Sequence, residues 1–156
     1  MFGGESNLKE RVIAQLNNNN NAFNNADPSF FDQFARDATI FTADSAEPIK
    51  GRDAYRRTHQ AALTGSRREK TVLDRTVQIV GDKAVVAQTA QIRQGGTSAL
   101  VRQTIVFGDT DEGLKIVHLH TAVVNPNPTG DILGKAGVRV INERIAATAP
   151  VLGVAQ

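Results

Sequence analysis

The chain has 156 residues, a mass of 16.8 kDa and 40% hydrophobic residues, which is enough to bury the core of one domain. Its formal net charge of +2 is too small to favour nucleic acid as a partner, and carboxylates interrupt the basic residues that gather between positions 50 and 75. The absence of cysteine excludes disulfide bonds, thiol nucleophiles and cysteine-bound zinc.

No apolar run approaches the roughly 18 residues that a membrane span needs. The first residues, Met1 to Ser6, lack the basic end and apolar stretch of a secretory signal. We therefore expect a cytoplasmic protein whose partners are neither membranes nor nucleic acids.

The first half of the sequence predicts helices. From about 5 to 26, apolar side chains recur at steps of four and seven, which places them on one helical face. Asn19 lies on the same stripe, so its amide would be buried and would need hydrogen-bond partners. Asp27-Pro28 ends this helix and starts a short second one, because proline is tolerated in a first turn.

Residues 38–42 predict a short strand, and residues 52–64 predict a third helix. Tyr55 and His59 are four residues apart and therefore share the inward face of that helix. Asp44 follows the short strand near the expected mouth of a pocket, where a carboxylate could act as a general acid or base.

Beyond residue 65 the apolar spacing changes from helical to alternating. The pattern predicts four long strands with glycine-containing turns between them, at about 70–80, 83–94, 98–107 and 114–124. Consecutive hairpins form an antiparallel meander, and strands of this length twist and coil. We therefore predict an α+β fold, in which a curved antiparallel sheet forms a cone or half-barrel around three N-terminal helices.

The proline-rich segment that begins at Asn125 ends the expected domain, which covers residues 1–125. The remaining residues, 126–156, form a C-terminal tail. Its weakly amphipathic spacing predicts a helix at about 132–148.

The last long strand carries two histidines, His118 and His120. Because they are two residues apart, we expect both to share one face of the sheet with Ile116. The opposite face, with Val117, Leu119 and Val123, is too apolar to be left in water. We predict that two copies of the chain pair through this second face as a homodimer.

Four segments of the chain are similar to a known superfamily: Asn25-Ala26-Asp27, Phe34-Ala35-Arg36-Asp37-Ala38-Thr39, Ile49-Lys50-Gly51-Arg52 and Leu114-Lys115-Ile116-Val117-His118-Leu119-His120-Thr121. They resemble the nuclear transport factor 2-like superfamily, which includes SnoaL-like polyketide cyclases, steroid isomerases and the association domain of calmodulin-dependent kinase. The resemblance covers about residues 7–125, although Leu114 replaces the usual tryptophan. It implies the cone fold and a pocket faced by His118 and His120, which makes them candidate proton shuttles.

The same comparison argues against a steroid isomerase. By an ungapped alignment from Asp27, the oxyanion tyrosine of those enzymes falls on Asn19, and their catalytic base falls on Thr42. Their protonated partner acid falls near Arg102 or Gln103. Proton abstraction beside a ketone needs a base and an oxyanion donor, and these positions supply neither.

Arg102 shares a face of its strand with Thr104, and that face is open to two interpretations. On the concave side, Arg102 could hold a carboxylate or an enolate, whereas on the convex side it would stack in a dimer interface.

The three histidines have neither an H-x-x-x-H spacing nor a carboxylate at ligand spacing, so we expect no metal. No glycine-rich nucleotide loop is present, so we expect no cofactor.

Two functions remain open. The favoured one is a small-molecule pocket protein similar to SnoaL-like cyclases and isomerases, which would carry out acid–base chemistry on an organic anion. Its candidate residues are His118, His120 and Arg102 for catalysis, and Asn19, Tyr55, His59 and Asp44 for substrate binding. The alternative is a non-catalytic association or ligand-binding module, in which the same residues only fill a cavity. The sequence therefore leaves open whether the protein is an enzyme.

Overall fold

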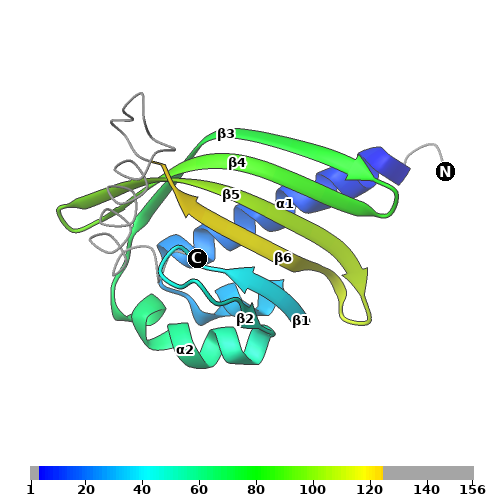
Figure 1. Cartoon of the computed structure of the whole chain (residues 1–156). Coiled ribbons are helices and arrows are strands. Elements are labelled where there is room, and N and C mark those ends of the chain that lie inside the picture. Colours follow the sequence, from blue (N-terminus) through cyan, green and yellow to red (C-terminus); the bar gives the residue numbers. More distant parts are fainter. Residues whose placement is uncertain (1–3, 125–156) are drawn as a thin grey trace.

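The computed structural model describes residues 4–124, which form a curved, unclosed six-stranded sheet with helices against one face (Figure 1). This is the α+β class that the alternating and helical patterns predict. None of the helices in this part of the chain is long and apolar enough to cross a membrane.

Four long strands form the expected meander. They are β3 (Glu69–Val80), β4 (Lys83–Gln94), β5 (Thr97–Thr110) and β6 (Gly113–Val123). Each strand runs antiparallel to the next along the chain. The turns between them contain Gly81, Gly95 and Gly113, whose backbones have positive φ angles that glycine adopts without strain.

Two shorter strands extend the sheet beyond β6. β1 (Phe34–Phe41) runs parallel to β6, and β2 (Ile49–Lys50) is antiparallel to β1, so the strand order is β2-β1-β6-β5-β4-β3. The sequence predicted β1 but neither β2 nor the parallel pairing. A parallel neighbour from the far end of the chain leaves no turn signal, because no hairpin joins the two strands.

The inner face of the sheet is covered by two α-helices and one 3-10 helix. α1 (Gly4–Asn24) packs against β3 and β4, whereas α2 (Arg52–Gly65) packs against β1 and β2 (Figure 1). Between them lies η1 (Pro28–Gln33), whose first turn is capped by the Asp27 carboxylate, which accepts a hydrogen bond from the Ser29 backbone N–H. The second of the three expected helices is thus a short 3-10 segment.

An aromatic core fixes α2 against η1 and β1. The ring centroid of Tyr55 lies 5.2 Å from those of Phe31 and Phe34 and 6.1 Å from that of Phe30, and Tyr55 is fully buried. Edge-on ring pairs of this kind contribute about 0.5–1.5 kcal/mol beyond the burial of their area. The direction of the Tyr55 hydroxyl is therefore set by rigid packing.

A β-bulge at Val117 reverses the faces of β6. Phe107 of β5 pairs with Ile116, but the preceding Val106 pairs with His118, so Val117 is an extra residue. Ile116 and Leu119 consequently both point inward, with exposed fractions of 1% and 3%. The histidines lie on the outer face, and the expectation that they share a face with Ile116 is wrong.

The bulge also corrects the surface that we expected to mediate a dimer. Leu119 is buried inside the domain, and Val123 pairs with the inward-facing Val101 and packs against the same core. Neither can serve as an outer contact. The domain boundary after residue 125 and the tail helix at 132–148 lie outside the described residues.

Candidate functional site

The end of β1 and the inner side of α2 bring four polar side chains together, which we call the β1–α2 cluster: Thr42, Asp44, Tyr55 and His59. His59 Nε2 lies 4.0 Å from Asp44 Oδ2, and the Thr42 hydroxyl donates a short hydrogen bond to the other Asp44 oxygen. The rings of Tyr55 and His59, one helical turn apart, have centroids separated by 5.1 Å. The cluster unites three of the residues that the sequence proposed for substrate binding.

Burial sets the protonation states in the cluster. It lowers the pKa of His59, and Asp44 offsets only part of this effect, so the imidazole is mainly neutral near pH 7. Burial, with a smaller contribution from Asp44, raises the pKa of Tyr55 well above its ordinary value. Tyr55 therefore keeps its proton as a potential hydrogen-bond donor. Within the described part of the chain its hydroxyl has no partner.

The hydrogen bonds of Thr58 favour one tautomer of His59. The Thr58 hydroxyl donates to the Ala54 carbonyl at 2.8 Å, so its oxygen is left to accept from His59 Nδ1–H, also at 2.8 Å. The lone pair of the neutral ring is then on Nε2, which faces Asp44. This arrangement suits a general base, because the carboxylate stabilises the imidazolium that forms when Nε2 takes a proton.

A row of hydrogen-bonded polar side chains crosses the inner face of the sheet at one level, and we call it the polar row: Arg75, Gln88, Gln103 and Thr121. Arg75 Nε donates to Gln88 at 3.0 Å, Gln88 donates to Gln103 at 2.9 Å, and Gln103 donates to Thr121 at 3.1 Å. Each step joins residues that are register partners on adjacent strands. The row therefore spans four strands.

The polar row leads to the β1–α2 cluster. Phe41 pairs with His120 in the parallel ladder, so the next residues, Thr42 and Thr121, lie side by side on the inner face. Both are buried, at 4% and 3% exposure. Polar side chains thus follow one another along the inner face from Arg75 on β3 to Thr42 of the β1–α2 cluster.

Asn19 also lies on the inner side, as its helical stripe predicts. It is 7% exposed, and its Nδ2 has no hydrogen-bond partner within the described residues. No hydrogen bond joins it to either polar group described above. It comes from α1, which packs against β3 and β4, whereas the cluster lies at β1 and α2.

The three residues proposed for catalysis lie on the other side of the sheet. Arg102 is exposed and pairs with Thr89 and Ala122 on the outer face. The rings of His118 and His120 pack beside Phe41, with centroid distances of 6.1 and 5.6 Å. The structure therefore separates these residues from Tyr55, His59 and Asp44.

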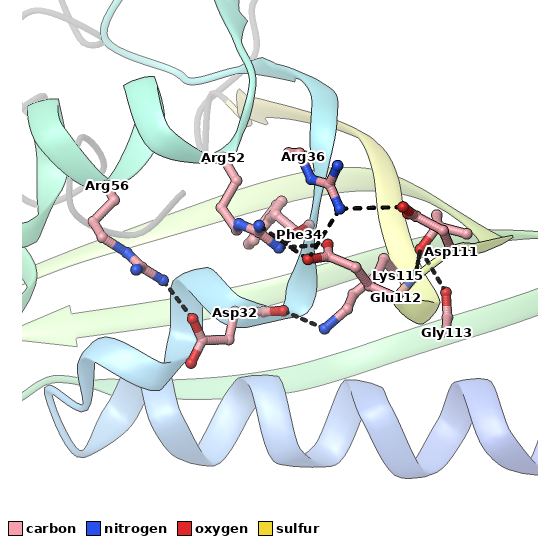
Figure 2. A network of polar contacts seen from close by, with 10 residues as sticks. Asp32, Phe34, Arg36, Arg52, Arg56, Asp111, Glu112, Gly113 and Lys115 are labelled. Atoms are coloured by element: carbon pink, nitrogen blue, oxygen red, sulfur yellow. Dashed lines mark hydrogen bonds and ion pairs between the residues drawn. The ribbon is translucent and has the colours of Figure 1, made fainter.

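An ionic network holds α2, which carries Tyr55 and His59, against the β5–β6 hairpin (Figure 2). Arg52 donates to both carboxylate oxygens of Glu112, at 2.9 and 3.3 Å, and to the Phe34 carbonyl at 3.2 Å. Arg36 joins Glu112 and Asp111 from β1. Hydrogen bonds from Arg52, followed by its charge, lower the pKa of Glu112. The network positions the helix that supplies the candidate base.

The sequence analysis missed the polar row, although the sequence carried a signal for it. Gln88 alternates with Val86 and Ala90, and Gln103 alternates with Val101 and Ile105, so each amide stands at a position whose neighbours are buried. A polar residue on the apolar side of a strand pattern marks an interior hydrogen-bond site.

Among residues 4–124, no group of histidine and carboxylate side chains is arranged to hold a metal ion.

Comparison with known proteins identifies the fold. A family model described as a SnoaL-like domain matches residues 12–126. A candidate dehydratase of the nuclear transport factor 2-like (NTF2-like) family from Streptomyces avermitilis has a similar structure, with a TM-score of 0.66, 21% identity, and coverage of 74% of this chain and 95% of that one. No curated protein sequence is significantly similar to the chain.

Two further structures show how diverse the similar proteins are. A candidate scytalone dehydratase from Novosphingobium aromaticivorans has a TM-score of 0.66 and 12% identity, covering 80% of this chain and 89% of that one. The association domain of CaMKII from C. elegans has a TM-score of 0.64 and 19% identity, covering 77% and 98%. At these identities the similarity establishes a shared fold alone.

Proposed function

The chain belongs to the SnoaL-like domain family of the NTF2-like superfamily, and from this premise we propose that it binds a small organic anion on the inner face of its sheet and performs acid–base chemistry on it. One observation carries the proposal: His59 Nε2 and Asp44 Oδ2 lie 4.0 Å apart, and the ring of His59 packs 5.1 Å from that of Tyr55, whose buried hydroxyl has no hydrogen-bond partner within residues 4–124. Burial raises the pKa of Tyr55 well above its ordinary value and lowers that of His59, and shifted pKa values in a cluster of polar side chains are typical of functional sites.

His59 is the proposed general base. Its neutral ring accepts a proton at Nε2, and Asp44 then faces the imidazolium. The gap of 4.0 Å is too long for a hydrogen bond in the free chain. Catalytic contacts in ligand-free structures are often long and tighten when substrate binds, so this distance is compatible with the role.

Tyr55 is the proposed donor to the charge that develops on the substrate. When a proton leaves a carbon beside a carbonyl, negative charge builds up on the oxygen, and a protonated hydroxyl without another partner can stabilise it. Two similar structures are named as candidate dehydratases. Dehydration needs a proton removed from carbon and another given to the leaving hydroxyl, which this set of residues could supply.

Arg75 is the proposed anion-binding residue, in place of the outward-facing Arg102. Its guanidinium is half-buried, and burial lowers its pKa, although an arginine stays charged at neutral pH. In the described residues it forms no ion pair with a carboxylate. A half-buried cation without a counter-charge is partly desolvated, and a carboxylate or enolate from a ligand would offset the cost of that desolvation.

The first test is a thermal-shift screen of small organic acids and their neutral amides. We expect acids to raise the Tm of the wild-type protein more than the amides do, and Arg75→Gln to remove the difference. Arg102→Gln is the matched control, because it removes one positive charge from the outer face. An equal loss in both variants would contradict an anion site on the inner face.

The second test detects proton transfer without knowledge of the product. Acids that bind are incubated in D2O, and NMR follows the exchange of carbon-bound protons beside carbonyl groups. We expect His59→Gln to slow exchange by roughly 100-fold or more, the usual contribution of a general base. His118→Gln and His120→Gln should leave the rate unchanged. Exchange that survives His59→Gln would refute the assigned base.

A second candidate function is assembly, because the association domain of CaMKII shares the fold and the outer face carries an aromatic group. Phe41, His118 and His120 are in ring contact there, and in the described part no helix packs over them. The homodimer predicted from the sequence would then use these residues and not Leu119. Sedimentation of the full chain should show a dimer that Phe41→Asp dissociates. A monomeric wild-type protein would contradict assembly.

A further inference from the structure

Lys70 is a largely buried lysine on the inner face of β3, outside the set of residues used above. It pairs with the fully buried Ile92 of β4 and is itself 7% exposed. Its Nζ lies 5.7 Å from the centroid of the Phe23 ring. Among residues 4–124, Nζ forms neither a hydrogen bond nor an ion pair.

The charged groups around Lys70 are cations on its own strand and on the segment before it. Arg75 follows on β3, and Arg68 also stacks on Phe23, with its guanidinium carbon 4.9 Å from the ring centroid. The residues that pack against Lys70 from α1 and β4 are uncharged: Phe23, Asn20, Asn24 and Ile92. Burial, with a smaller contribution from Arg75, lowers the pKa of Lys70 to about 7. A neutral, nucleophilic amine is therefore far more populated near pH 7 than in an ordinary lysine.

The asparagine-rich helix α1 holds the backbone of this lysine. The Lys70 N–H donates to Asn24 Oδ1 at 2.7 Å, while the Asn24 and Asn20 amides donate to the Lys70 carbonyl at 3.4 and 3.3 Å. The main chain is thus fixed by three hydrogen bonds, whereas the amine has none. Desolvation and a neighbouring cation both activate a lysine nucleophile, and the fixed backbone sets the position from which the amine extends.

We propose that Lys70 forms an imine with a small aldehyde or ketone that carries an acid group, that is, an oxo acid. The amine lone pair attacks the carbonyl carbon, the carbonyl π electrons move to oxygen, and a proton passes from nitrogen to that oxygen. The resulting carbinolamine loses water as the C=N bond forms. Arg75 binds the acid group, and this part of the inference rests on the proposed anion site. No oxidant or cofactor takes part.

The experiment traps the imine on the full-length protein. The probe is 4-oxopentanoate at pH 7, with sodium cyanoborohydride to reduce the C=N bond to a stable amine. Peptide mass spectrometry locates the adduct, whose mass gain is that of the acid less one oxygen atom. We expect Lys70 to be labelled at least tenfold more than the exposed Lys50, because an ordinary lysine is neutral in only about one molecule in a thousand or fewer at this pH. Lys70→Met should abolish the selective label, and Lys50→Met should preserve it.

The neutral ketone pentan-2-one separates this inference from the proposed function. Weaker labelling by pentan-2-one, with the difference removed in Arg75→Gln, supports an oxo acid as the ligand. Equal labelling by both compounds overturns the acid selectivity and also counts against the anion site. If Lys70 is labelled no more than Lys50 while organic acids still raise the Tm, the imine is refuted and the anion site stands.

Discussion

Arg68 joins the ends of both α-helices, and replacing it with methionine should destabilise the protein. It is 6% exposed and donates hydrogen bonds of 2.8 Å to the Phe23 and Leu63 carbonyls and one of 2.5 Å to the Ser66 carbonyl. The Phe23 and Leu63 carbonyls belong to the last turns of α1 and α2, where the helix itself supplies no partner, and Ser66 is the C-cap residue of α2. A cation is also favoured there by the helix dipoles.

The expected loss follows from these contacts. A buried hydrogen bond from a charged donor contributes about 1.5–3 kcal/mol, so the two buried bonds to Phe23 and Leu63 amount to roughly 3–6 kcal/mol. Removal of the guanidinium also removes its desolvation cost, which is the cause that lowers the pKa of Arg68. Methionine keeps an apolar contact with the Phe23 ring. We therefore expect Arg68→Met to lower the free energy of unfolding by about 3 kcal/mol.

Urea unfolding followed by far-UV circular dichroism and by tyrosine fluorescence measures this loss. Tyr55 is the only tyrosine, and the chain has no tryptophan, so the fluorescence reports the β1–α2 cluster alone. The control is Arg67→Met, an exposed neighbour, which should change the free energy by no more than about 0.5 kcal/mol. A loss below about 1 kcal/mol for Arg68→Met would show that the carbonyls are satisfied without the guanidinium.

Three further predictions concern single positions. Tyr55→Phe should weaken the response to ligands while stability stays equal or rises by about 1 kcal/mol in urea unfolding, because it removes a buried hydroxyl without a partner. Lys70→Met should be more stable than wild type by a few kcal/mol at pH 6. The stability gain of Lys70→Met should shrink between pH 7 and about 10, because Lys70 keeps its proton in the unfolded wild-type chain over this range but loses it in the folded protein. A gain that does not change with pH would contradict the burial of the Lys70 charge. Gly51→Ala should lower the free energy of unfolding by about 2 kcal/mol, because φ is +93° and the added Cβ would lie 2.9 Å from the Arg36 carbonyl oxygen. The control is Gly65→Ala, which has open space around the added Cβ and should leave the free energy of unfolding unchanged.

Periodicity in the sequence predicted most of the elements but not all of their partners. The steps of four in α1 and the alternation in β3 to β6 are local patterns, and the observed bounds of these elements differ from the predicted ones by a few residues. The short β2 and the parallel neighbour of β1 depend on contacts between distant segments. Local patterns carry no information about such contacts.

The bulge at Val117 explains why only part of the arrangement of the candidate site residues could be predicted. Tyr55 and His59 were placed correctly by helical spacing, since the helix between them is regular. His118 and His120 were placed on the wrong face, because one inserted residue inverts the alternation for everything beyond it. A bulge depends on the neighbouring strand, so the pattern of a single strand does not reveal it.

The parallel pairing of β1 with β6 also affects how the chain reaches this fold during synthesis. β3, β4 and β5 can pair as hairpins soon after each leaves the ribosome. The parallel pairing of β1, in which Ile40 is the partner of Leu119, cannot form until β6 has been synthesised. Until then β1 exposes an unpaired edge with apolar residues such as Ala38 and Ile40, which become fully buried only in the finished sheet. Chains released before β6 is complete should therefore aggregate through this edge, and the β1–α2 cluster should be among the last parts of the molecule to form.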